Sequence, residues 1–217
     1  LVYRHDISPS RRSTELVVRM NLRNHIILAE RYLPSDLRRE YRADWTQRYT
    51  AIGRQLGHHA AVRRALSQGR VRAWGEALRG RRVLSRTAIE AVFGLDRQAR
   101  AIARWATKYC LRRVLIADLS KNIYATWRGC MEAGLAVRAI ADDHPAFAEL
   151  TYRGTPIITN EAAFLDEPDG IILSNINPAQ VGERFETIRR HYHGPMLQLW
   201  HPRELDFESA NPQPAVA

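Results

Sequence analysis

The sequence predicts an α/β protein in which an N-terminal basic helical segment precedes a small parallel-sheet, Rossmann-like domain. Two observations carry this prediction. The first half contains long stretches whose apolar residues recur three and four positions apart, which is the period of a helix. From residue 112 onward, short apolar runs alternate with helical stretches, and this alternation is typical of parallel strands joined by right-handed crossovers.

Charge is distributed unevenly along the chain. Residues 1–104 contain 22 Arg and 9 acidic residues, a net charge of +13, whereas residues 105–217 contain 11 basic and 14 acidic residues, a net charge of −3. We therefore expect two parts, 1–104 and 105–217, that meet within residues 95–111. A basic part suits phosphate, nucleic acid or an anionic membrane surface. Because 31 of the 33 basic residues are Arg, a solvated surface from an Arg-rich genome is an equal alternative.

Four helical stretches are expected in the first part. Ser13 caps a helix that Pro34 ends, and a second helix runs from Ser35 to about Gly53. A third covers about residues 59–79, and residues 89–108 form one helix or two with a break near Gly94. The apolar faces expected for the first three helices are Leu16, Val17, Met20, Ile27 and Leu28; Leu37, Tyr41, Trp45, Tyr49 and Ile52; and Val62, Leu66, Trp74 and Leu78. We interpret Trp45, Tyr49 and Trp74 as packing residues.

The second part alternates between strands and helices. The expected strands are RRVLIAD, LAVRAIADD, GTPIIT, DGIILS and PMLQLW, and the helices between them are NIYATWRGCMEAG, EAAFL and PAQVGERFETIRRHY. The residues Tyr152, Arg153 and Gly154 are expected to form a turn.

Cysteine content and hydropathy indicate a cytoplasmic protein that does not cross a membrane. Cys110 and Cys130 have neither metal-ligand spacing nor partners for a disulfide framework, so both are expected to be reduced core residues. No apolar run approaches the roughly 18 residues that span a bilayer. Contact with the inner membrane would therefore be peripheral.

The opening residues resemble the closing stretch of bacterial family-2 glycosyltransferases. The resemblance is carried by YRHD, a basic Ser-rich loop and LVVRMNLRNHIILAERYLP, with the matching residues His5, Ser10, Arg11, Arg12, Arg23, Asn24, Tyr32 and Pro34. It covers residues 1–90, most closely the first 35.

This resemblance implies a metal-dependent, inverting transfer of sugar from a nucleotide-diphosphate donor to a lipid-linked or polysaccharide acceptor. His5 would help to hold a divalent metal, Mg²⁺ or Mn²⁺, and Arg11, Arg12 and Arg23 would face the diphosphate. The acidic metal motif and catalytic base of that family have no counterpart in this sequence. We therefore expect a C-terminal portion that does not catalyse transfer by itself.

Residues 112–201 resemble the nucleotide-sugar-binding half of bacterial sugar acetyltransferases. RVLIAD, LAVRAIADDHP, YRGTPII and DGIILS carry the resemblance. It implies a ligand at the carboxyl edge of the sheet, with Lys121 and the start of a helix near phosphate and Asp142 and Asp143 near a ribose. Ser174 follows the DGIIL strand at the same edge. The glycine-rich loop of that family is replaced by ADLSKNIYATWRG, which has no glycine before Gly129, so weak binding or a purely structural domain are both open.

The function expected from the sequence is thus the C-terminal portion of a glycosyltransferase of cell-surface polysaccharide synthesis, whose basic helices rest on anionic lipid. One alternative is a non-catalytic module that binds a nucleotide sugar or a dinucleotide. A second is an Arg-rich nucleic-acid-binding protein, which the absence of a helix-turn-helix or aromatic RNA-binding signature disfavours.

Overall fold

The computed structural model describes residues 13–199 and consists of two compact units, which divide between Ser85 and Arg86. The division lies ahead of the range 95–111 expected from charge. The reason is that helix α5 (Leu95–Lys108) packs on α6 (Ile123–Glu132). A Cβ added to Gly129 of α6 would lie 2.6 Å from Ile102 Cδ1 and 3.2 Å from Ala99 Cα, so the two helices approach too closely for any side chain at this position.

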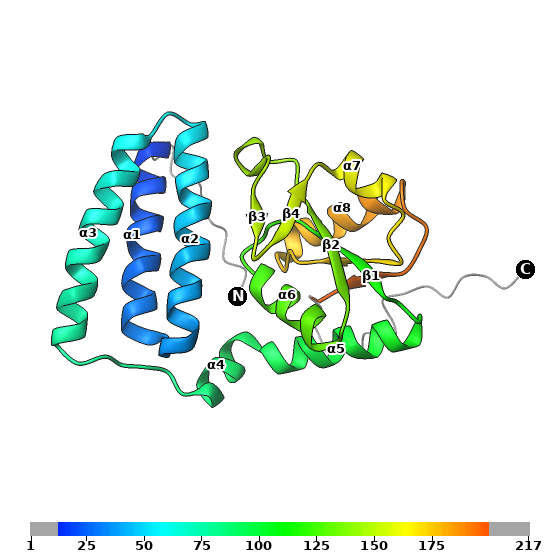
Figure 1. Ribbon diagram of the computed structural model, residues 1–217, viewed down its shortest axis with the longest axis horizontal. Helices are drawn as coiled ribbons and strands as arrows, with labels where there is room; N and C mark the ends of the chain where they lie inside the picture. The colour runs from blue at the N-terminus through cyan, green and yellow to red at the C-terminus, as the bar shows by residue number, and fades with distance from the viewer. Residues whose placement is uncertain (1–12, 200–217) are drawn as a thin grey trace, which may run out of the picture. The chain divides into compact units, whose positions relative to one another are not determined.

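Within its described residues, 13–85, the first unit contains three helices, labelled in Figure 1: α1 (Thr14–Tyr32), α2 (Ser35–Gln55) and α3 (His59–Leu78). Ser13 caps α1 by accepting a hydrogen bond from the Leu16 N–H, and α1 ends two residues before Pro34. The extended backbone of Pro34 then starts α2. The expected ends of these helices agree with the structure to within about two residues.

The buried face of α1 differs from the expected one. Val18, Leu22 and Ile26 form the core, whereas Leu16, Val17 and Leu28 are exposed. The helix contacts both α2 and α3, so the buried strip follows the positions that face both neighbours at once. Hydrophobicity alone did not identify that strip.

Aromatic packing joins α1 to α2. The His25 ring stacks on Trp45 with 3.7 Å between ring centroids, and its Nδ1 lies 2.6 Å from the Tyr41 hydroxyl oxygen. Burial raises the pKa of Tyr41 to about 12. Tyr49 belongs to the same core, so Trp45 and Tyr49 are packing residues as expected, but Trp74 of α3 is 68% exposed and is not one.

Glu30 is the charged centre of the helical unit. Its side chain is 9% exposed and pairs with Arg38 and Arg42 of α2 and with Arg81 of the segment after α3. Three guanidinium groups from two segments therefore converge on one nearly buried carboxylate, which ties α1, α2 and the residues after α3 together.

The second unit is an α/β domain. From residue 112 onward the strands and helices expected from the sequence follow one another as predicted, and one short strand and one 3₁₀ turn occur in addition. The unit begins with α4 (Arg86–Phe93) and α5, which Gly94 separates with a φ of 58°. The remaining elements are β1 (Arg113–Ala117), α6, β2 (Ala136–Ala141), the short 3₁₀ turn η1 (Pro145–Phe147), β3 (Thr151–Tyr152), β4 (Thr155–Ile158), α7 (Asn160–Leu165), β5 (Gly170–Leu173), α8 (Pro178–Arg189) and β6 (Met196–Gln198). Tyr152 thus ends a short strand, and Arg153 and Gly154 form the turn.

The six strands lie in the order β3-β4-β2-β1-β5-β6, and all neighbours are parallel except the β3–β4 hairpin. The parallel strands thus have the Rossmann arrangement, in which chain progression reverses beside β1. Every second residue of β1 and β5 (Leu115, Ala117, Ile171, Leu173) packs with α7 and α8, whereas α6, which joins β1 to β2, covers the other face (Figure 1). The α/β fold class is confirmed.

The two cysteines have different environments. Cys130 is buried in α6, and burial raises the pKa of its thiol to about 12. Cys110 is exposed in the turn after α5, so its expected place in the core is wrong.

Replacing Glu30 with Gln should destabilise the helical unit by about 2 kcal/mol, because three arginines would lose the carboxylate that they share. Thermal and urea unfolding followed by circular dichroism measure this change. The matched control is Glu15→Gln, an exposed residue in the first turn of α1, which should cost less than about 1 kcal/mol. Equal effects of the two changes would contradict the role of Glu30.

Replacing Asp169 with Asn should lower the melting temperature at neutral pH. The Asp169 carboxylate accepts hydrogen bonds from the backbone N–H groups of Arg112 and Arg113 and from the Arg113 guanidinium, and these bonds hold its pKa below the usual value. Because the folded-state pKa is lowered, this stabilisation is present above the unfolded pKa of about 3.9 and is lost as the pH falls through the folded pKa. The difference between wild type and variant should therefore shrink in acid, and a difference that stays constant would contradict it.

Candidate functional site

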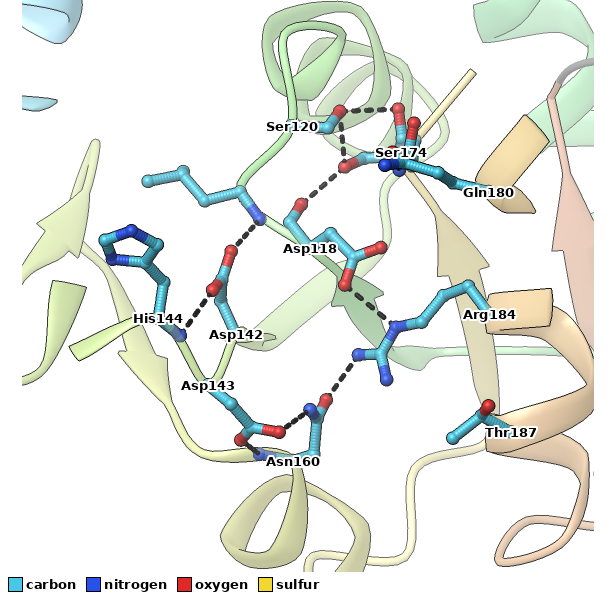
Figure 2. Close-up of polar contacts among 12 residues, drawn as sticks. Asp118, Ser120, Asp142, Asp143, His144, Asn160, Ser174, Gln180, Arg184 and Thr187 are labelled. Carbon is cyan, nitrogen blue, oxygen red and sulfur yellow. Dashed lines mark hydrogen bonds and ion pairs between the residues drawn. The ribbon is translucent and has the colours of Figure 1, made fainter. Parts of the chain in front are cut away.

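Four parallel strands bring polar side chains to one edge of the sheet (Figure 2). Asp118 directly follows β1, Asp142 and Asp143 follow β2, Asn160 opens the helix after β4, and Ser174 follows β5. All of them lie at the carboxyl ends of their strands, which is where open α/β sheets bind ligands. Arg184 of α8 reaches the same edge.

Asp142 connects the loops after β1 and β2. One carboxylate oxygen accepts the Leu119 N–H at 2.8 Å, and the other accepts the His144 N–H at 2.8 Å. The residue thus stands where the sequence predicts a ribose-binding acid, but both oxygens already accept a backbone donor. A carboxylate has about four acceptor positions, so capacity for ligand hydroxyl groups remains.

Ser174 closes the space between the loop after β1 and the end of β5. Its side chain is fully buried and bonds to the Asp118 carbonyl oxygen, and its Oγ lies 2.9 Å from Ser120 Oγ. Ser120 in turn donates to the Ser174 carbonyl oxygen at 2.6 Å. The two serines therefore connect the loop after β1 to the end of β5, beside the point where chain progression reverses in the sheet. The Ser174 side chain lines this edge without being exposed to solvent.

The loop after β1 uses its own N–H groups internally. The Asp118 N–H donates to the Ala141 carbonyl, the Leu119 N–H to Asp142, and the Asn122 N–H to Ser120 Oγ. In glycine-rich dinucleotide loops the backbone approaches the phosphates at this place. Here the Leu119 side chain is buried in the loop, and protein oxygens take up donors that a phosphate would need. Lys121 is exposed, with no ion pair to another described residue.

Asp118, Arg184, Asn160 and Asp143 form a continuous polar chain (Figure 2). Arg184 Nε donates to Asp118 Oδ1 at 2.9 Å, and its Nη2 donates to Asn160 Oδ1. The Asn160 backbone N–H donates to Asp143 Oδ1 at 2.8 Å, and its side-chain amide donates to the other oxygen. One arginine from α8 thus holds together loops that follow three different strands.

Burial is the main influence on Asp118. It raises the pKa of this carboxyl group, Arg184 opposes the rise, and the neighbouring Asp142 and Asp143 add to it. Asp118 also has a φ of 70°, a left-handed conformation that is uncommon outside glycine. Three carboxylates share this edge with Arg184, whose side chain is 18% exposed. The electrostatic potential of the edge therefore favours hydroxyl and amide donors over phosphate.

The sequence did not single out Asp118, Asn160 or Arg184. Asp118 and Asn160 carried a usable signal, since each stands just after a strand of a parallel sheet. The sequence contains no comparable signal for Arg184, because its role depends on how α8 crosses the sheet. Lys121, Asp142, Asp143 and Ser174 do lie at the expected edge, with the different environments described above.

The remaining candidates from the sequence lie elsewhere. His5, Arg11 and Arg12 fall outside the described residues. Arg23 lies on α1 and donates hydrogen bonds from Nε and Nη2 to the Oδ1 of neighbouring Asn24 at 3.2 and 3.0 Å. The two side chains of the Arg-Asn pair are therefore bonded to each other.

Within residues 13–199, no three His, Cys, Asp or Glu side chains are grouped so that they could hold a metal ion. Over the same range, no helix is both long and apolar enough to cross a bilayer. The chain matches no known family model, no curated protein and no solved structure.

Replacing Arg184 with Met should destabilise the α/β unit by about 2 kcal/mol at neutral pH, because Asp118 would keep a largely buried charge without its partner. Loss of Arg184 raises the Asp118 pKa further, and a raised folded-state pKa costs stability only above the unfolded value of about 3.9. The defect should thus be smaller at pH 4 than at pH 7 in urea unfolding.

Arg190→Met is the matched control, since Arg190 is exposed just beyond α8, and it should change stability by less than about 0.5 kcal/mol. The double variant Asp118→Asn/Arg184→Met should recover part of the loss. A defect that does not depend on pH would contradict the pairing.

Proposed function

We propose that the α/β unit is a non-catalytic module that binds a nucleotide sugar through its hydroxyl groups, in a protein that serves sugar transfer from a nucleotide-diphosphate donor. The observation that carries this proposal is the set of polar side chains at the carboxyl edge, namely Asp118, Asp142, Asp143, Asn160 and Arg184. An edge of this kind at the switch point of a parallel sheet is the usual ligand position in Rossmann-like folds.

The residues at this edge favour binding over catalysis. Ser120 and Ser174 bond to each other and to backbone carbonyl oxygens, which are not general bases. His144 uses Nδ1 to accept the Ala146 N–H at the start of a short turn. The carboxylates at this edge retain capacity to accept hydrogen bonds from ribose or sugar hydroxyls.

The same edge supports only a weak hold on diphosphate. The N–H groups of Asp118, Leu119 and Asn122 are used internally, and the Asp118 carboxylate adds negative charge beside them. A helix start still favours anions, and Lys121 adds one exposed positive charge near the start of α6. We therefore expect sugar and ribose contacts to contribute more to affinity than phosphate contacts.

The wider proposal rests on the resemblance to family-2 glycosyltransferases. In the complete enzyme, a divalent metal such as Mg²⁺ or Mn²⁺ would balance the donor diphosphate, with His5 among its ligands and Arg11, Arg12 and Arg23 facing phosphate. The acceptor would be lipid-linked or a growing polysaccharide. In this proposal the α/β unit recognises a nucleotide sugar apart from the catalytic centre.

Titration of the full chain with UDP-glucose, followed through backbone amide shifts, tests the binding proposal. We expect shifts in the loops at 118–122, 142–144 and 174–177, with a dissociation constant on the order of 1 mM or weaker, which corresponds to only about 4 kcal/mol. Glucose and UDP alone serve as separate probes, and UDP should bind no more tightly than UDP-glucose. NAD⁺ tests the dinucleotide alternative.

Asp143→Asn should weaken UDP-glucose binding several-fold, because one acceptor carboxylate at the edge loses its charge. Asp166→Asn is the matched control, since Asp166 is an exposed carboxylate after α7 that pairs with Arg138. A silent titration, or shifts confined to other loops, would refute the binding proposal.

A further inference from the structure

The exposed face of α3 has an apolar stripe that the bundle does not cover. Val71, Trp74 and Leu78 are 66%, 68% and 68% exposed, and their spacing of three and four residues places them on one face. The orientation of α3 is fixed by the opposite face, where Ala65, Gly69 and Ala73 are buried. A Cβ on Gly69 would lie 2.9 Å from Ile26 Cδ1, so α3 packs closely on α1 and cannot rotate to bury the stripe.

Positive charge surrounds this stripe. Arg63, Arg64 and Arg70 are exposed on the same side of the helix, and none has an ion pair with another described residue. Arg70 precedes Trp74 by about one turn, and Arg63 and Arg64 precede it by about three turns. Glu76 is the one acidic residue of α3, and it pairs with Arg31 and Arg79. The face therefore combines apolar surface with uncompensated cations.

Two basic residues of α2 pair with an acidic residue of α1. Arg38 and Arg42 lie on one of the basic helices that the sequence places near anionic lipid, and both form ion pairs with Glu30. This pairing turns two of the five arginines of α2 toward Glu30 of α1. Residues 13–85 as a whole still contain 15 Arg against 6 acidic residues, so the remaining positive charge includes the face of α3.

We propose that the Val71–Trp74–Leu78 face of α3 docks on an anionic lipid surface, with Arg64 and Arg70 against the headgroups. Trp prefers the headgroup level of a bilayer, and arginine side chains reach upward from a shallowly inserted helix to lipid phosphates. A nucleic acid would match the arginines but would gain nothing from burying Val71 and Leu78. The lipid surface matches both. This inference does not depend on nucleotide-sugar binding by the other unit.

Flotation of the full chain with phosphatidylcholine vesicles, with and without phosphatidylglycerol, tests the docking surface. We expect binding to the anionic vesicles, little binding to the neutral ones, and loss of binding as salt rises, because screening shortens the range of the attraction. Trp74→Ser/Leu78→Ser should reduce partitioning on the order of tenfold or more, since two large side chains would no longer enter the interface. These side chains are exposed, so circular dichroism should remain unchanged.

Two matched controls separate this face from general charge or hydrophobicity. Leu78→Ala should weaken binding, whereas Leu165→Ala, at a 79% exposed position in the other unit, should not. Arg64→Gln/Arg70→Gln should weaken binding more than Arg112→Gln/Arg190→Gln, which removes the same charge from exposed positions in the α/β unit. Equal binding to neutral vesicles, insensitivity to the α3 variants, or binding to duplex DNA but not to vesicles would each overturn the proposal.

Discussion

The carboxylate of Asp142 controls the geometry of the sheet edge. By accepting N–H groups from the loop after β1 and from the loop after its own strand, it fixes the distance between them. The Ser120–Ser174 contact makes the same connection on the other side of β1. The loop is thus held from both sides, and the Asp118 carboxylate accepts a hydrogen bond from Arg184. Where a glycine-rich loop would hold a phosphate, N–H groups of this loop therefore donate to oxygen atoms of the protein itself.

The two units place charge in opposite ways. In the helical unit, arginines from α2 and the segment after α3 converge on a single carboxylate, Glu30, and those on the outer face of α3 remain unpaired within the described residues. At the edge of the α/β unit, a single arginine serves carboxylates and an amide from several loops. A nearly buried charge is stable in each case only because its partners complete its hydrogen bonds. The basic surface of α3 and the acidic edge of the α/β unit would therefore suit different partners.

Much of the fold could be predicted from the sequence because its signals are local. Alternating apolar runs, Pro34 and Gly94 located the strands and helix ends of both units, since period and backbone constraint act over a few residues. The prediction of the buried face of α1 was wrong because the positions of two neighbouring helices together determine that face. The exposure of Trp74 depends on the orientation of α3, which its close packing against Ile26 fixes. At the site, Asp142 and Ser174 were found from their positions after strands. Their actual partners were not, because Leu119 and Ser120 belong to a loop some 23 and 54 residues away in the chain.

The absence of glycine after β1 also affects the conformation of the loop itself. A glycine at Leu119 would leave the loop backbone open to a ligand, whereas the Leu119 side chain is buried and anchors the loop to the protein interior. Asp118 then adopts the left-handed conformation that a glycine would otherwise supply, and Arg184 holds its carboxylate in place. The edge is thus preorganised by side chains that compete with diphosphate but not with hydroxyl groups. In the proposed binding site, selection among ligands would follow from the hydrogen-bonding capacity that the protein leaves unused, which includes carboxylate oxygens.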